Sequence, residues 1–362
     1  MLSIGYLASV LEASGRSAAP ASGRRSAAEI EPVQRHPSHD RSGRKLAARI
    51  VAVAGGKGGV GKSVLSANLA IAMAGSGRRV ALVDADIGMG NQHTLLGIAR
   101  PGPGIVGFLK NDVQELSQVA VATEYPNLVL YPSDGAQGVP QLSHSRKERL
   151  LRHISRIDAD VVVLDLGAGA ALGALDMFAL ADIHVLVITG QVTSIQNAYA
   201  FLKAAVLRLL SRLADNSEKR ALIEQGWRDT RPPTLQSLAE WLRTRDPEMA
   251  AFTDALASRM SVRLVGNLLF DQHEHRVPQS IGRMIRDYLG INAEVAGLIP
   301  ASRKVHDSIT RRKPVVVLDP HGPASREIRR VAESLLAQPL PAKRLVSQTV
   351  VESEVAEAAT AP

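Results

Sequence analysis

The chain of 362 residues is long enough for one large α/β domain with extensions, or for two small domains. It is 45% hydrophobic and 22% charged, as an ordinary globular protein is, and its lack of cysteine excludes disulfides, thiolate metal sites and cysteine nucleophiles. The net charge of +8 permits nucleic acid or anionic lipid as a partner without indicating either. No apolar run reaches about 18 residues and no basic segment precedes the apolar N-terminal stretch, so we expect a cytoplasmic protein without a membrane-spanning helix.

The first 48 residues are rich in serine, alanine, proline, glycine and arginine, with one short amphipathic stretch at the beginning. Such a composition buries too little apolar surface to fold alone, so we expect a disordered, basic arm. Residues 1–49 carry eight Lys/Arg and four Asp/Glu, which is half of the net charge of +8. We expect the folded domain to span residues 49–338 and a flexible tail to follow over residues 339–362.

A glycine-rich loop lies between a predicted strand and a predicted helix. The apolar run 50–53 predicts the strand, five glycines follow within seven residues, and helical spacing lasts from Lys62 to about Gly75. Backbone N–H groups of such a loop, with the start of the helix, form a cradle for phosphate oxygens. Lys62 is placed to reach the β- and γ-phosphates, and Ser63 is placed to bind Mg²⁺. The pattern G-x-x-x-x-G-K-[ST] predicts a nucleotide-binding set of Gly56, Lys57, Gly58, Gly59, Val60, Gly61, Lys62 and Ser63.

A second lysine inside the loop, Lys57, produces the string KGGVGKS. This string resembles the deviant Walker A motif of the MinD/ParA ATPases. The resemblance implies ATP and Mg²⁺ as cofactors, and an ATP-dependent homodimer in which Lys57 reaches the nucleotide of the partner subunit. Lys57 is then catalytic in trans, and we expect hydrolysis to depend on protein concentration.

The next predicted strand, residues 79–83, is followed by two carboxylates, Asp84 and Asp86. Carboxylates at the carboxyl end of a strand, beside a phosphate loop, lie where ligands bind in open α/β sheets. The continuation, with Gly88 and Asn91, resembles the first switch segment of the MinD/ParA family. The resemblance implies that Asp86 is catalytic, because it orients or deprotonates the attacking water, and that Asp84 supports the magnesium shell.

After a strand at residues 128–131 and an amphipathic helix, the apolar run 160–165 predicts another buried strand. It has the Walker B pattern, and we expect Asp165 at its end to hold Mg²⁺ through water. Residues 165–169, DLGAG, resemble the second switch of the FlhG/FleN branch, the flagellar-number regulators, which carries D-[ST]-G-A-G. Leu166 replaces the hydroxyl residue of that pattern, so one polar contact near the metal is not expected here.

Residues 183–189 predict a further buried strand, and a hydroxyl at Thr193 or Ser194 is expected to cap the helix that follows. Residues 212–258 then interrupt the alternation of strands and helices and contain both tryptophans. We expect a helical insertion here, with its tryptophans packed onto the domain; a partner-binding surface is the alternative.

The C-terminal part resumes the sheet with predicted strands at residues 263–270 and 293–299, separated by a helix at 281–289. Asn267 lies where MinD/ParA proteins read the adenine edge, and Pro300 ends a G-x-I-P loop that borders the base in that family. The resemblance implies that both bind nucleotide. For Asn267, a buried side chain that satisfies backbone groups is the alternative.

The alternation of strands and helices predicts the fold class, an α/β fold with a doubly wound, mostly parallel sheet and helices on both faces. Together with the resemblance, this is a P-loop NTPase fold of the SIMIBI type.

We interpret the chain as an ATP-hydrolysing switch of the MinD/ParA superfamily, nearest to FlhG/FleN, which dimerises with ATP and regulates the number or placement of a cellular structure, above all flagella. Its implied partners are a second copy of the chain and a flagellar or other positioning protein. A membrane surface, at the cell pole or elsewhere, is a further candidate partner. One alternative is a ParA-like ATPase that positions cargo on DNA through basic residues at 303–304, 311–313 and 326–330. Another is a metabolic or signalling P-loop enzyme.

Overall fold

The computed structural model describes residues 48–87, 89–133, 143–169 and 172–339, which lie in the second of two units of the chain, residues 38–362. Nearly all of the expected N-terminal arm and C-terminal tail lies outside the described residues.

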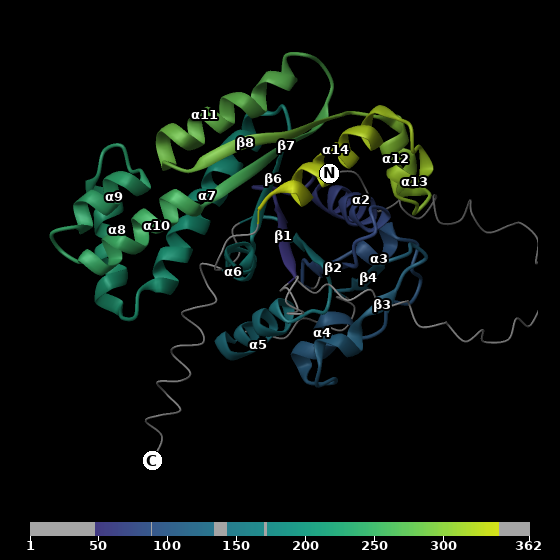
Figure 1. Ribbon diagram of the computed structural model, residues 1–362, viewed down its shortest axis with the longest axis horizontal. Helices are drawn as coiled ribbons and strands as arrows, with labels where there is room; N and C mark the ends of the chain where they lie inside the picture. Colours follow the sequence, from purple (N-terminus) through teal and green to yellow (C-terminus); the bar gives the residue numbers. More distant parts are fainter. Residues whose placement is uncertain (1–47, 88, 134–142, 170–171, 340–362) are drawn as a thin grey trace, which may run out of the picture. The chain divides into compact units, whose positions relative to one another are not determined.

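An eight-stranded sheet forms the centre of the fold (Figure 1). The strand order is β3-β4-β2-β5-β1-β6-β7-β8, and all neighbouring strands are parallel except β3 and β4. The apolar, β-branched runs of the sequence form these strands because parallel strands are buried on both faces. The strands are β1 (Arg49–Ala54), β2 (Val80–Ala85), β3 (Val121–Ala122), β4 (Leu128–Tyr131), β5 (Val161–Leu166), β6 (Ile183–Ile188), β7 (Ser261–Leu269) and β8 (Asn292–Pro300).

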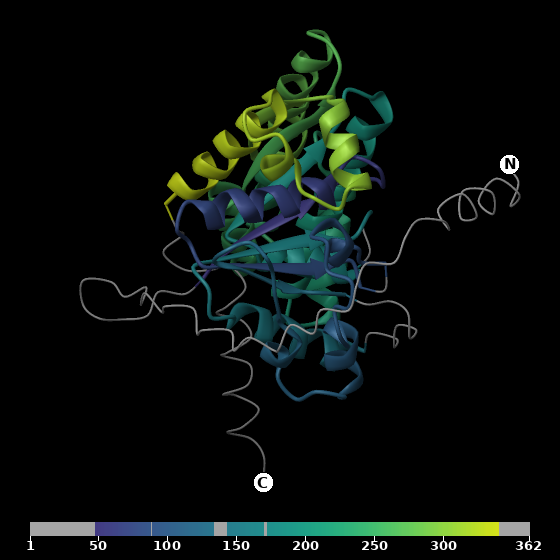
Figure 2. The same ribbon diagram turned by 90° about the vertical axis from the view of Figure 1, so that its right-hand side faces the viewer.

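Helices cover both faces of this sheet, which confirms the predicted doubly wound fold (Figures 1 and 2). The hydrophobic cluster on one face includes residues of three helices, α2 (Lys62–Gly75), α13 (Val315–Leu318) and α14 (Pro323–Ala337), and α12 (Arg303–Thr310) packs at its edge. The cluster on the other face includes residues of α4 (Gly104–Lys110), α5 (His144–Ser155), α6 (Leu172–Leu180), α7 (Val192–Leu213) and α11 (Val277–Leu289).

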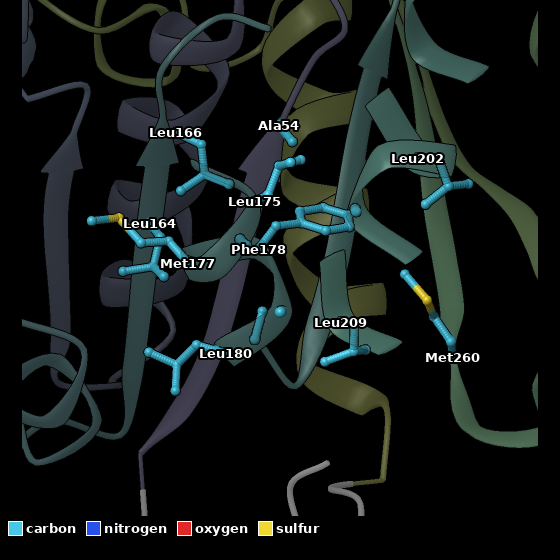
Figure 3. Close-up of a cluster of buried hydrophobic side chains, with 14 of the residues drawn as sticks. Ala54, Leu164, Leu166, Leu175, Met177, Phe178, Leu180, Leu202, Leu209 and Met260 are labelled. Atoms are coloured by element: carbon cyan, nitrogen blue, oxygen red, sulfur yellow. The ribbon is translucent and has the colours of Figure 1, made fainter. Parts of the chain in front are cut away.

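The alternation of side chains along the strands decides which residues reach which face. In β5, Leu164 and Leu166 join the cluster under α6, and Figure 3 shows them with Ala54, Leu175 and Phe178. Asp165, between them, therefore points to the face that α2 covers. Leu166 is 1% exposed in this core, so the leucine is accommodated on the side of the sheet away from the carboxylate.

Between α7 and β7, where the sequence predicted a helical insertion over residues 212–258, lie three helices, α8 (Ser217–Asp229), α9 (Leu235–Leu242) and α10 (Pro247–Arg259). They lie together beside the end of α7 (Figure 1). Trp227 is buried in the core. Trp241 is partly buried, and the Arg245 guanidinium lies 4.0 Å from its ring centroid.

Among the described residues, no helix is both long enough and apolar enough to cross a membrane.

Candidate functional site

The phosphate loop, residues 55–61, connects β1 to α2 at the carboxyl end of the sheet. Gly61 has a φ of +85°, and a Cβ there would lie 2.3 Å from Asn267 Nδ2, so the position requires glycine. A Cβ at Gly56 would lie 2.1 Å from the carbonyl carbon of Asn197 in α7. The loop is thus held between β7 and α7. Gly61 offers no side-chain cap to α2, so the first N–H groups of this helix are available to an anion.

The first turn of α2 faces the ends of β2 and β5. Asp84 and Asp165 are paired in the register of these two strands, so both carboxylates point to the α2 side of the sheet. Asp165 Oδ1 accepts a hydrogen bond of 3.0 Å from the hydroxyl of Ser66. Lys62 is buried, and it brings a positive charge to Asp165.

The electrostatics of the two carboxylates favour a cation. Burial raises the pKa of Asp84 well above its usual value, and the charge of Asp165 raises it further. Burial also raises the pKa of Asp165, although hydrogen bonds from Gln92, Ser63 and Ser66 oppose this. Asp84 Oδ1 has no hydrogen-bond partner within the described ranges. Hydroxyl and carboxylate oxygens are the ligands that Mg²⁺ prefers, so Ser63, Asp84 and Asp165 fit this ion.

Gln92, the first residue of α3 (Gln92–Leu95), belongs to the site although sequence reasoning did not predict it. It is fully buried, and its Nε2 donates to Asp165 Oδ2 at 2.7 Å and to the Ser63 carbonyl at 2.9 Å. Its backbone N–H donates to Asp84 Oδ2 at 3.0 Å. No motif marks this glutamine, because its role depends on the pairing of two strands far apart in sequence.

Asp86 follows β2 and lies half-buried next to the loop after β5. A Cβ at Gly167 would come within 2.9 Å of Asp86 Oδ1, so the two segments predicted as switches touch at this point. Asp86 therefore lies beside the loop that directly follows Asp165.

Lys57 contacts its own chain at the start of α7. Its ammonium donates to Gln191 Oε1 at 2.8 Å and to Thr193 Oγ1 at 2.9 Å. The predicted capping of this helix by Thr193 or Ser194 is wrong, because α7 begins after Gln191 without a side-chain cap. The Ser194 hydroxyl instead accepts from the backbone N–H of Thr189 at 3.0 Å.

Asn267 and Pro300 lie on the β7–β8 side of the loop. Asn267 is buried and its Nδ2 donates to the Val60 carbonyl at 2.9 Å, which is the contact expected of an asparagine that satisfies the backbone. Pro300 ends β8, opposite Leu269 of β7. A hollow of 390 Å³ opens beside it, and its lining includes Leu268, Phe270, Ala301, Val305, His306 and Ile309.

A glycine-rich phosphate loop and two paired carboxylates at the carboxyl ends of neighbouring parallel strands define a P-loop nucleotide-binding protein. A comparison of the sequence with protein families shows which family of P-loop proteins this is. Residues 51–315 match the family described as the CobQ/CobB/MinD/ParA nucleotide binding domain, and the chain belongs to this family.

Individual relatives agree with the predicted branch. The chain is 27% identical to the antiactivator FleN of Pseudomonas aeruginosa over 297 residues, which is 81% of this chain and 88% of FleN. It is 31% identical to the flagellum site-determining protein YlxH of Helicobacter pylori over 43% of this chain and 53% of that protein. A solved MinD structure from Pyrococcus horikoshii, complexed with Mg-ADP, has the same fold, with a TM-score of 0.54 at 16% identity over 80% of this chain and 96% of that one.

Proposed function

We propose that this chain is a molecular switch that binds and hydrolyses ATP, dimerises with ATP and regulates the number or placement of a cellular structure, with flagella as the first candidate. The observation that carries the proposal is the junction at the start of α2, where the phosphate loop meets Asp84 and Asp165. Phosphoryl transfer to water needs positioning and charge neutralisation, and this junction offers both.

The proposed roles follow the layout of the site. Loop N–H groups and the Lys62 ammonium hold the phosphates, and Ser63 and Asp165 hold Mg²⁺ with Asp84 in support. Bound Mg²⁺ neutralises charge on the phosphates. Asp86 orients the water. The base lies in the hollow beside Pro300, and Asn267 supports the loop from behind.

Dimerisation is supported by the surface around the loop. Met89 and Phe270, each 80% exposed, follow β2 and β7 at the carboxyl edge of the sheet, and exposed large apolar side chains are common at interfaces. The two Lys57 hydrogen bonds lie at the surface, so water can replace them when Lys57 moves to a partner's nucleotide.

The test is light scattering on Asp86→Ala protein, which should bind ATP without turning it over. We expect Mg-ATP to double its mass, Mg-ADP to leave it monomeric, and the added change Lys57→Ala to abolish the doubling. Lys219→Ala, on α8 away from the loop, is the matched control and should dimerise normally. If the Lys57 variant dimerises like the control, or if ATP binds without any gain in mass, the switch proposal is wrong.

The cellular output is tested separately. The similarity to YlxH, which is named a flagellum site-determining protein, supports flagella. We expect cells without the gene to differ from cells with the unsubstituted gene in the number or position of flagella seen by electron microscopy. Cells with Asp86→Ala should differ from both of these strains. Unchanged flagella in both strains would contradict this assignment and leave the ATP switch to be judged by scattering.

A DNA-based positioning function is the second candidate. Arg303, Lys304, Arg311, Arg312 and Lys313, on and just after α12, are all exposed. Lys/Arg contacts with phosphates make binding fall steeply with salt. Retention of the ATP-bound protein on random-sequence DNA at low salt, lost at high salt and lost on replacing these five residues, would favour this function over the flagellar one.

A further inference from the structure

Gln92 is the fully buried side chain that links the two carboxylates to α2. Nε2 uses both of its hydrogens, one on Asp165 Oδ2 and one on the Ser63 carbonyl. These two acceptors fix the orientation of the amide, because the reversed amide would place Oε1 against two oxygens. Oε1 is therefore an acceptor, and among the described residues it has no hydrogen-bond partner.

A buried acceptor without a partner is costly, and native proteins nearly always satisfy it. The donor that Oε1 requires must reach a position beside Asp165 and Ser63. Magnesium in proteins keeps several of its waters, and each of these waters is a hydrogen-bond donor. Each oxygen of a carboxylate accepts about two hydrogen bonds, so Asp165 can keep Gln92 Nε2 and still accept from a water on the ion.

We propose that Gln92 is a magnesium-positioning residue: its Nε2 orients Asp165 and the Ser63 backbone, and its Oε1 accepts a hydrogen bond from a water bound to Mg²⁺. The proposal rests on the proposed function, because it needs Mg²⁺ at Ser63 and Asp165. Partners of this kind around a metal site change metal affinity by about 10–100-fold when they are removed.

The same residue links the ion to the backbone of the first switch. The Gln92 N–H donates to Asp84 Oδ2, so the start of α3 is tied to one carboxylate while the side chain is tied to the other. Fixing the side chain on a hydrated ion therefore fixes α3. Asp86 lies in the same segment, between β2 and α3, so this contact couples magnesium binding to the residue proposed to orient the water.

The experiment measures the affinity for methylanthraniloyl-ADP by fluorescence, in EDTA and across a Mg²⁺ titration, with the full-length chain. We expect Gln92→Met to bind the nucleotide in EDTA as the unsubstituted protein does, and to need about tenfold more Mg²⁺, or more, for half of the Mg²⁺-dependent tightening. Gln236→Met, the same substitution at an exposed position of α9, should match the unsubstituted protein in both measurements.

A half-saturating Mg²⁺ concentration within twofold of the control value would overturn the proposal. Failure of the unsubstituted protein to bind the nucleotide would instead overturn the proposed function, and this proposal with it. If Gln92→Met does not fold, hydrogen exchange on the unsubstituted protein tests the proposed role of Gln92 instead. We expect Mg²⁺ added to the ADP complex to slow amide exchange over α3, and slowing confined to the phosphate loop would refute the role of Gln92.

Discussion

Asp176 and Asp84 are both buried, but their surroundings differ. Asp176, on α6, is contacted by Lys147 Nζ at 2.6 Å, Arg208 Nε at 2.7 Å and Arg212 Nη1 at 3.3 Å. Burial alone would raise the pKa of Asp176, but hydrogen bonds from Arg208 and Lys147 hold this pKa below its usual value. Asp84 faces a second carboxylate, and burial raises its pKa.

The difference separates a structural carboxylate from a binding one. The cluster of Asp176 and its three cations joins α5, α6 and α7, and Arg212 also binds Glu148 at 2.8 Å. Its charges are satisfied by side chains of the domain itself. The site around Asp84 keeps acceptors without partners among the described residues, which costs stability and prepares the site for a cation.

The largest expected effect is on the free energy of unfolding and comes from the structural carboxylate, Asp176. Asp176→Ala leaves three cations in a buried cluster without their shared anion, so we expect it to lower the free energy of unfolding by about 3–5 kcal/mol. Urea denaturation followed by circular dichroism measures this. A loss below about 1 kcal/mol would mean that water reaches the cluster. Asp176 would then not be the structural carboxylate that the comparison with Asp84 requires.

The second prediction concerns pH and His184 on β6, which lies against Phe178 with 4.7 Å between ring centroids. Burial lowers the pKa of His184 from 6.5 to about 4. Below pH 6.5 the His184 imidazole binds a proton in the unfolded chain but stays neutral in the folded protein. The free energy of unfolding should therefore decrease by on the order of 3 kcal/mol as the pH falls to about 4.

The measurement for His184 is the difference in unfolding free energy between the unsubstituted protein and His184→Gln, at several pH values. We expect glutamine to become relatively more favourable as the pH falls from 7 to 4. A difference that stays constant over this range would show that His184 is not held neutral.

The third prediction concerns Asp84, for which stability changes with pH in the opposite direction to His184. Its raised pKa means that the folded state resists ionisation, so stability falls as the pH rises above the usual value of 3.8. Asp84→Asn removes the charge and offers an N–H group to Asp165. We therefore expect it to stabilise the protein at pH 7 by about 1 kcal/mol.

Thermal unfolding at pH 7 and near pH 3 checks this, since the advantage of Asp84→Asn should vanish at the lower pH. The same variant should gain less stabilisation from Mg-ADP than the unsubstituted protein. An asparagine that destabilises the protein at pH 7 would contradict the assignment of Asp84 to the binding side of the comparison.

The smallest expected effect on stability is that of another aspartate-to-alanine substitution, the same change as in Asp176→Ala. Asp254 pairs with Arg243 at 2.9 Å within the insertion, but both side chains are about half exposed, at 46% and 57%. Asp254→Ala should therefore change stability by less than about 1 kcal/mol in the same urea experiment. A loss as large as that of Asp176→Ala would show that burial does not distinguish the two ion pairs.

The sequence predicted most of the fold because buried parallel strands are continuous apolar runs. Val161 to Leu164 could be recognised in this way, and Asp165 stood out as the carboxylate at their end. The short antiparallel strand β3 was not predicted, since two residues give no periodicity. Its pairing with β4 is visible only in the folded chain.

The site was predictable where one local pattern carries it, as in residues 56–63. It was not predictable where it depends on register. Nothing near Gln92 indicates that its amide bridges Asp165 and Ser63, because the contact exists only once β2 and β5 pair. The Thr193 cap was not found because α7 begins after Gln191, and the Thr193 hydroxyl instead accepts from the distant Lys57.

The first strand and the last helix are joined by Arg49. Its guanidinium donates to the carbonyls of Leu335, at 2.9 Å, and of Leu336 and Gln338, so the beginning of β1 holds the end of α14. The first and the last parts of the described chain therefore lie side by side. The phosphate loop lies at the other end of β1, about 20 Å away for six extended residues. The described residues therefore begin and end at the opposite edge of the sheet from the proposed nucleotide site.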